Sequence, residues 1–209
     1  MFSAGQIEKG EECMLNIGIL VFPVVKELDF VGPYEVFSAA NKLTPQSVDV
    51  KLLAFEEGSL TGASGMTFSP NASPKNAGKL DVLIIPGGTG KREALHDRRM
   101  IKFVTEQYEH VKLLGTVCTG AFLAAEAGLL HGKTATTHRR HLDELAAFPG
   151  VKVVDKKVVK DGKILTAGGV SSGIDLALCI LAILFDGKFA QDTADYIEYF
   201  FRNDIYAEY

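Results

Sequence analysis

The segment VKLLGTVCTGAFLAAEAGLL, residues 111–130, joins a short apolar run to an alanine-rich pattern. The run over 111–117 is typical of a buried strand, and the part that follows Thr119 has the spacing of a helix. Cys118 lies at the junction, and Gly120 permits the tight strand-to-helix turn of a nucleophile elbow. The segment therefore predicts a strand–turn–helix unit with a cysteine at its turn.

Similar units are predicted on both sides of this segment. Strands that are apolar on both faces and separated by helical patterns indicate a parallel sheet covered by helices on both sides. We therefore expect one α/β sandwich domain over residues 15–209, preceded by a tail over 1–14. The further strands are expected at 15–22, 48–55, 80–86, 133–137 and 151–169. A hairpin or an irregular excursion is expected at 61–70, and helices in the later part of 26–43 and over 97–111, 139–148, 171–186 and 188–201.

Composition excludes several classes of protein. The 209 residues are 47% hydrophobic and 23% charged, with a formal net charge of −4 and no basic block, which argues against a nucleic-acid partner. The longest apolar stretch, residues 174–185, contains Asp175 and is too short to span a bilayer, so no membrane partner is expected. The polar N-terminus lacks the pattern of a secretory signal, which predicts a cytoplasmic protein.

The cysteines and histidines give no metal signature. Cys13, Cys118 and Cys179 form an odd set without a CxxC pair, so neither a disulfide framework nor a cysteine zinc site is indicated. Cys179 falls within an apolar helix and is interpreted as structural, and Cys13 as an exposed thiol of the tail. His138 and His141 have a spacing close to that of a metal pair, but no third ligand is evident. We expect no metal.

Three segments leave strands at one edge of the predicted sheet, where ligands bind in open α/β folds. They are LDFVGP after the first strand, PGGTG after the third, and VCTG after the fourth. A cysteine at the start of a helix lies near unpaired N–H groups and the positive end of the helix dipole, which predicts a lowered pKa for Cys118. The alternative is a buried structural cysteine. Its position at the strand end beside Gly120 favours the nucleophile.

The other two segments supply candidate partners for the thiol. Asp29 is either a helix cap or, if it faces the crevice, a desolvated carboxyl with a raised pKa that can transfer protons. The amides around Gly87, Gly88 and Thr89 could bind substrate or an oxyanion. A glycine pair is also common in simple turns, and no dinucleotide or phosphate-binding motif is present. His138 is either a supporting base or a capping residue.

Four stretches together resemble the ThiJ/PfpI superfamily of class I glutamine-amidotransferase-like proteins. They are LDFVGPYEVF, DVLIIPGGTG, GTVCTGAFLAAEAGLLHGKTATTH and TAGGVSSGIDLAL, and the resemblance extends over residues 15–186. Asp29 and Thr119 match the branch that contains isocyanide hydratase and the ligand-binding domain of AraC-type regulators. The resemblance implies a flavodoxin-like three-layer sandwich, a reactive Cys118 at a nucleophile elbow, and a homodimer.

The branch implies a cysteine-dependent lyase that hydrates an isocyanide to an N-formamide through a thioimidate, with Cys118, Asp29 and Thr119 as catalytic residues and without a cofactor. Thr119 replaces the histidine that follows the cysteine in the hydrolase-like members, so an amidase or glyoxalase-like activity is a weaker alternative. A non-catalytic ligand-binding or redox-sensing protein is a third. We expect no added AraC-type DNA-binding domain in a chain of this length. Arg139 replaces a tryptophan that is common in the branch, and the segment 198–209 lacks its proline-rich stretch, which leaves the substrate open.

Overall fold

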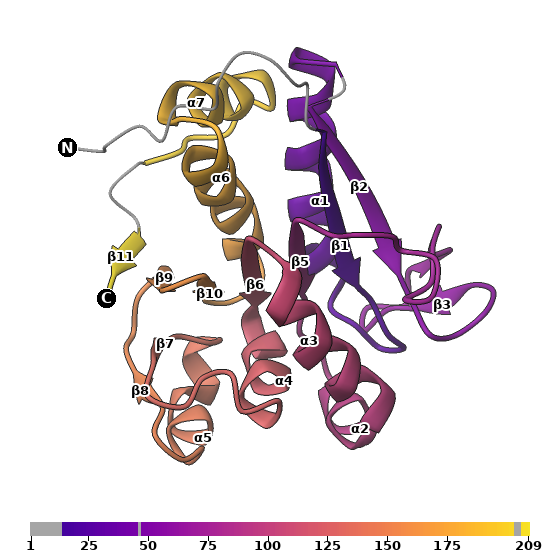
Figure 1. Ribbon diagram of the computed structural model, residues 1–209, viewed down its shortest axis with the longest axis vertical. Helices are drawn as coiled ribbons and strands as arrows, with labels where there is room; N and C mark the ends of the chain where they lie inside the picture. The colour runs from indigo at the N-terminus through magenta and orange to yellow at the C-terminus, as the bar shows by residue number, and fades with distance from the viewer. Residues whose placement is uncertain (1–13, 46, 203–205) are drawn as a thin grey trace.

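A seven-stranded sheet forms the centre of the protein (Figure 1). The computed structural model describes residues 14–45, 47–202 and 206–209. The strand order across the sheet is β11-β9-β10-β6-β5-β1-β2. The strands are β1 (Leu15–Leu20), β2 (Val48–Leu53), β5 (Val82–Ile85), β6 (Leu113–Val117), β9 (Val158–Asp161), β10 (Ile164–Ala167) and β11 (Tyr206–Glu208).

The middle of the sheet is parallel and fully buried, as predicted. β2, β1, β5, β6 and β10 pair in parallel, and every residue of β5, β6 and β10 is buried. Burial on both faces explains why these segments are continuously apolar instead of alternating. β9 pairs antiparallel with β10 through the Asp161–Gly162 turn, which confirms the predicted hairpin.

Two groups of helices flank the sheet. α1, α6 and α7 pack together, and Figure 1 shows α6 and α7 beside α1. α2, α3 and α4 form the second group, and α5 packs against α4. This arrangement confirms the expected α/β sandwich. The helices are α1 (Glu27–Leu43), α2 (Lys91–His96), α3 (Arg98–His110), α4 (Ala121–Glu126), α5 (Leu142–Ala146), α6 (Ser172–Leu184) and α7 (Gly187–Tyr196).

Two small pairs of strands lie outside the main sheet. β3 (Leu60–Thr61) and β4 (Thr67–Phe68) form the hairpin expected over 61–70. β7 (Thr134–Ala135) and β8 (Lys152–Val153) pair in parallel with each other, and do not join the main sheet.

Helix α1 begins earlier than predicted. The Gly32–Pro33 pair suggested that only the later part of 26–43 is helical, but the helix starts at Glu27 and includes both residues. Pro33 lacks an amide hydrogen, so it cannot donate to the carbonyl of Asp29 one turn earlier. The N-terminal turn of α6 packs closely here, since a Cβ added to Gly173 would lie 3.0 Å from Pro33 Cδ and 3.3 Å from the Asp29 carbonyl oxygen. Tertiary packing thus retains a helix that local sequence argues against.

Other boundaries also differ from the predictions. α4 ends at Glu126, shortly before Gly128, whose φ of 75° is left-handed. α7 ends at Tyr196, and Glu198 with a φ of 52° prevents the helix from continuing to residue 201. α2 and β11 were not predicted; β11 is a three-residue strand whose pairing with β9 is not visible in local sequence.

Among the described residues, no helix is both long and apolar enough to cross a membrane. Cys13 and most of the predicted tail lie outside the described residues. The cytoplasmic location and the single-domain boundary at residue 15 stay predictions.

Candidate active site

Cys118 lies directly after β6, at the carboxyl edge of the parallel strands. Its φ is 55°, a left-handed conformation that is rare for a residue other than glycine. The Cys118 amide donates to the Gly168 carbonyl at 2.8 Å, and the Thr137 hydroxyl donates to the Cys118 carbonyl at 2.6 Å. These two bonds hold the residue in a strained strand-to-helix turn, the geometry that a nucleophile elbow requires.

Gly120 lets this turn approach the end of β5. A Cβ at position 120 would lie 2.0 Å from the carbonyl oxygen of Ile85 and 2.9 Å from that of Pro86. No side chain fits within such a distance, because neither carbonyl belongs to a flexible group. The predicted supporting role of Gly120 therefore has a direct steric basis at the β5–β6 junction.

Asp29 lies in the first turn of α1 and is completely buried. It does not cap the helix; its Oδ2 instead accepts a hydrogen bond from the Gly87 amide at 3.0 Å. The carboxyl group lies near enough to the Cys118 thiol for each to shift the pKa of the other. Oδ1 is buried and otherwise has no partner within the described residues. Of the two roles considered for Asp29, the structure places it in the crevice beside the cysteine.

The electrostatics of this pair differ from the expected activated thiolate. Burial, followed by the negative charge of Asp29, raises the pKa of the Cys118 thiol to about 11. Burial also raises the pKa of Asp29 to about 7, although the bonds from Gly87 and Cys118 oppose this shift. The expected lowered pKa at Cys118 is therefore wrong for the resting site. The helix after the cysteine is a 3-10 turn (Cys118–Gly120) followed by the short α4, so its dipole is small.

Thr119 and the glycine loop are held against each other. The Gly88 amide donates to Thr119 Oγ1 at 3.0 Å, and a Cβ on Gly87 would lie 2.5 Å from the Thr119 amide nitrogen. The Gly87 and Gly88 amides thus bind Asp29 and Thr119 in this structure, and their predicted oxyanion role stays a prediction. Thr89 is exposed, and its side chain forms no hydrogen bond with the other described residues of the site.

Two positions near the site were not singled out from the sequence. The Val170 amide, together with that of Thr119, hydrogen-bonds to the Cys118 sulfur, and Val170 has a left-handed φ of 39°. The Lys26 amide donates to the Gly87 carbonyl at 2.8 Å, and its charge lowers the pKa of Asp29. No residue pattern in the sequence reveals a strained valine whose amide lies near a sulfur.

The remaining candidates occupy structural positions. His138 Nδ1 accepts from the Arg140 amide at 3.2 Å, so it caps the following 3-10 turn (Arg139–His141), and its ring packs on Gly169. Burial lowers the pKa of His138. His141 bonds to Glu144 at 2.8 Å. Across the part of the chain that the structure describes, no cluster of three potential metal ligands occurs.

Asp175 and Cys179 are buried residues of the packed helix α6. Asp175 lies in the first turn of α6; its carboxylate pairs with Lys157 at 2.6 Å and accepts from the Tyr199 hydroxyl at 3.0 Å. Cys179 is buried, and burial raises the pKa of its thiol to about 12. Neither residue takes part in the contacts around Cys118.

Fold and site together define an α/β protein with a cysteine–carboxylate pair at the carboxyl edge of its sheet. Residues 16–183 match the model of the DJ-1/PfpI family, and the chain belongs to that family. This confirms the resemblance to the ThiJ/PfpI superfamily. A ThiJ/PfpI family protein from Pseudomonas syringae has a similar crystal structure, with a TM-score of 0.82 and 28% identity, covering 98% of this chain and 84% of that one.

The curated relatives differ in their described functions. Isonitrile hydratase from Pseudomonas putida is 35% identical over 185 residues, which are 88% of this chain and 78% of the relative. The HTH-type transcriptional regulator GbdR from Pseudomonas aeruginosa is 26% identical over 168 residues, which are 79% of this chain but 46% of the regulator. The family thus includes both a lyase and proteins that regulate transcription.

Proposed function

We propose that the protein is a cysteine-dependent lyase that hydrates an isocyanide to an N-formamide. The observation that carries this proposal is the buried Cys118–Asp29 pair, in which the residue after the cysteine is Thr119. A carboxylate beside a thiol can move one proton to and from a carbon atom, which the hydration of an isocyanide requires. The 35% identity to isonitrile hydratase supports the same reaction.

The first step uses Asp29 as a general base. At neutral pH the pair holds its proton mainly on sulfur, because the pKa of the thiol is raised to about 11 and that of Asp29 to about 7. As the sulfur attacks the terminal carbon of the isocyanide, Asp29 accepts the thiol proton and then delivers it to that carbon. A carbon–sulfur bond and a carbon–hydrogen bond form, giving a thioimidate. The Thr119 and Val170 amides stabilise the charge that develops on sulfur.

The second step hydrolyses the thioimidate. Asp29, again a carboxylate, accepts a proton from water as the water oxygen adds to the carbon, and then delivers this proton to the nitrogen. The carbon–sulfur bond then breaks, the hydroxyl proton returns to sulfur, and the N-formamide leaves. Isocyanide and water supply every atom of the product, so this sequence of steps calls for no metal or organic cofactor.

The reaction is tested by incubating the purified protein with aryl and alkyl isocyanides and following the formyl proton of the product by NMR. We expect turnover that Cys118→Ala abolishes and that Asp29→Asn lowers by about 10²-fold or more, since general acid–base catalysis contributes that much. Cys179→Ala is the matched control, because this cysteine is buried in α6 outside the site. If neither aryl nor alkyl isocyanides yield a formamide, the proposal is wrong.

The second candidate is a ligand-binding protein without catalysis. The similarity to the regulator GbdR favours it. The matched region is 46% of that protein, so a domain like this chain is there one part of a longer transcriptional regulator. A raised thiol pKa of about 11 argues against easy oxidation, and so against the redox-sensing form of this alternative. If isocyanides protect Cys118 from iodoacetamide without being converted, the binding function replaces the lyase.

A further inference from the structure

A cavity lies at the carboxyl end of β2, on the same sheet edge as Cys118. It has a volume of about 320 Å³, which suits a small ligand. The strands leading to the two places, β2 and β6, are three positions apart in the sheet, or about 14 Å. None of the site residues discussed above lines it. The cavity is lined by residues 54–58, Pro70 and residues 72–76.

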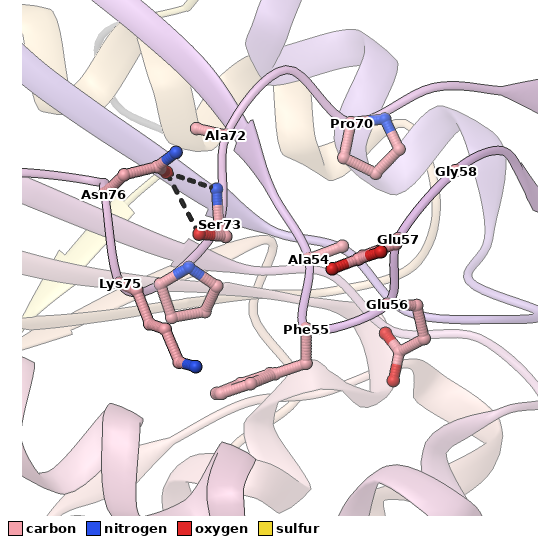
Figure 2. A pocket seen from close by; sticks show the side chains of 11 residues that line it. Ala54, Phe55, Glu56, Glu57, Gly58, Pro70, Ala72, Ser73, Lys75 and Asn76 are labelled. Atoms are coloured by element: carbon pink, nitrogen blue, oxygen red, sulfur yellow. Dashed lines mark hydrogen bonds between the residues drawn. The ribbon is translucent and has the colours of Figure 1, made fainter.

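One wall of the cavity carries carboxylates. Glu56 and Glu57 follow β2, and Figure 2 shows them on the side of the hollow opposite Ser73, Lys75 and Asn76. Glu56 Oε1 lies 3.4 Å from Arg99, whereas Glu56 Oε2 is buried and has no hydrogen-bond partner within the described residues. Because this oxygen has almost no exposed surface, it does not face the cavity, and the exposed Glu57 supplies the accessible carboxylate of this wall.

The opposite wall carries a single cation. Lys75 is exposed, and within the described parts of the chain its ammonium forms no ion pair with either glutamate. Lys75 belongs to a turn that is closed by Asn76, whose Oδ1 accepts from the Ser73 amide at 2.6 Å and from its hydroxyl at 3.1 Å (Figure 2). The turn therefore presents the lysine from a fixed backbone.

An aromatic ring lies between the two charged walls. Phe55 lines the cavity, and its ring is fixed from outside by an edge-to-face contact with Phe103, with centroids 6.0 Å apart, and by Arg99 at 5.1 Å from the ring centre. Pro70 and Pro74 add apolar wall that cannot change its φ angle. The apolar surface lies beside the charges and can accommodate a hydrocarbon group.

We infer that this cavity binds a small amino carboxylate, such as a free α-amino acid with an apolar side chain. The ligand ammonium bonds to Glu57, its carboxylate pairs with Lys75, and its side chain packs on Phe55. A zwitterion fits better than a simple amine or acid because only a zwitterion satisfies both walls. The site is independent of the proposed chemistry at Cys118.

The test measures binding of three probes to the intact protein by calorimetry: L-leucine, leucinamide, which lacks the carboxylate, and 4-methylpentanoate, which lacks the ammonium. We expect saturable binding of leucine and at least about tenfold weaker binding of the other two, since each loses a charge-assisted contact. Equal binding of leucinamide would make this a cation site and overturn the inference. No saturable binding of leucine would also overturn it.

Variants locate the site. Glu57→Gln and Lys75→Met are each expected to weaken leucine binding about tenfold, whereas Glu109→Gln and Lys42→Met, exposed positions on α3 and α1, leave it unchanged. Cys118→Ala retains full leucine affinity, so failure of this inference is separable from failure of the lyase. If leucine shifts the NMR signals around Cys118 and spares Phe55 and Lys75, the proposed location is wrong.

Discussion

Cys118 and Asp29 function as one titrating pair. The competent resting form has the proton on sulfur and a charged Asp29, so it exists between the two pKa values of about 7 and about 11. We therefore expect kcat/KM for isocyanide to rise as the pH increases through about 7, when Asp29 loses its proton, and to decline near 11. The measurement is initial rate against pH at low substrate. A rate that already reaches its plateau below pH 5 would contradict the proton-accepting role of Asp29.

The raised pKa of Asp29 also predicts a change in stability. The folded group has a pKa of about 7, against 3.8 for the free residue, so its protonated form stabilises the fold below pH 4, and this contribution is lost as the pH rises to about 7. Asp29→Asn is a neutral isostere that can still accept from Gly87. We therefore expect the wild type to lose stability between pH 4 and pH 8 while the variant does not. The difference between their free energies of unfolding, measured by urea denaturation, should change by on the order of 4 kcal/mol in favour of the variant. Parallel curves would exclude the shift.

At this scale the sequence predicted which residues meet but not their protonation. The positions of Cys118 and Asp29 follow from strand ends, because the carboxyl ends of parallel strands share an edge. The pKa of the thiol depends on burial by segments distant in sequence, and on a carboxyl group close enough to repel the thiolate. Local sequence contains neither quantity. The strained φ angle of Val170 was likewise not predicted, whereas the tight turn at Cys118 was.

At the scale of elements, the junction of β5 and β6 depends on the absence of a side chain at position 120. Gly120→Ala would bring a Cβ to 2.0 Å from the Ile85 carbonyl, so we expect a loss of about 3 kcal/mol or more in the free energy of unfolding. Gly187→Ala at the start of α7 is the matched control, because nothing lies within 4 Å of its added Cβ. Both variants are compared by thermal melting. A Gly120→Ala protein that melts within about 2 °C of wild type would contradict this packing.

An ion pair joins α2 to α5 and lies against Phe122 of α4. Lys91 Nζ lies 2.8 Å and 2.9 Å from the two carboxylate oxygens of Glu144 and 4.0 Å from the centre of the Phe122 ring. The Lys91 side chain is only 16% exposed, so the pair is screened less than an ordinary surface pair.

A double-mutant cycle with Lys91→Met and Glu144→Gln measures the coupling energy of this ion pair. We expect a coupling of about 1 kcal/mol in urea unfolding, at the upper end of the range for partly exposed pairs. The control cycle, Lys188→Met with Asp192→Asn on α7, involves a lysine that is 81% exposed and should give about 0.3 kcal/mol. Equal coupling in the two cycles would show that partial burial adds nothing at Lys91.

Helices and strands were predicted well where their apolar pattern determines them. They were predicted poorly where contacts between segments distant in sequence determine their bounds. The buried strands and α3 appear at their expected places, because their apolar patterns match their burial. The start of α1 was wrong because close packing with α6 retains Pro33 within the helix. β11 was missed because a three-residue strand exists only through its pairing with β9.

At the scale of the whole molecule, the order of strands places β1, β5 and β6 side by side, although α1 to α3 separate them in sequence. This order brings Asp29, Gly87 and Cys118 together from segments about 30 residues or more apart. The alternation of apolar runs and helices predicted the layers. It did not give the strand order, which the resemblance to a known family implied.

Exposed apolar side chains mark a candidate surface for the proposed homodimer. Four apolar side chains on α1 and the neighbouring loops are 38–43% exposed: Val24, Leu28, Val31 and Met66. The loop of Val24 bonds to the β3–β4 hairpin, through its amide and the Thr61 carbonyl at 2.9 Å, so the hairpin and α1 can form one face beside Asp29. Apolar groups of this kind are enriched where subunits meet.

We expect sedimentation equilibrium to show a dimer, which Val31→Asp converts toward monomer because a charge would be buried without a partner in the interface. Phe200→Asp is the matched control: Phe200 is 86% exposed and follows the end of α7, in a segment far from α1 in sequence. It should leave the dimer intact. A wild-type monomer would exclude the homodimer, and a dimer disrupted by Phe200→Asp but retained by Val31→Asp would move the interface to the C-terminal segment.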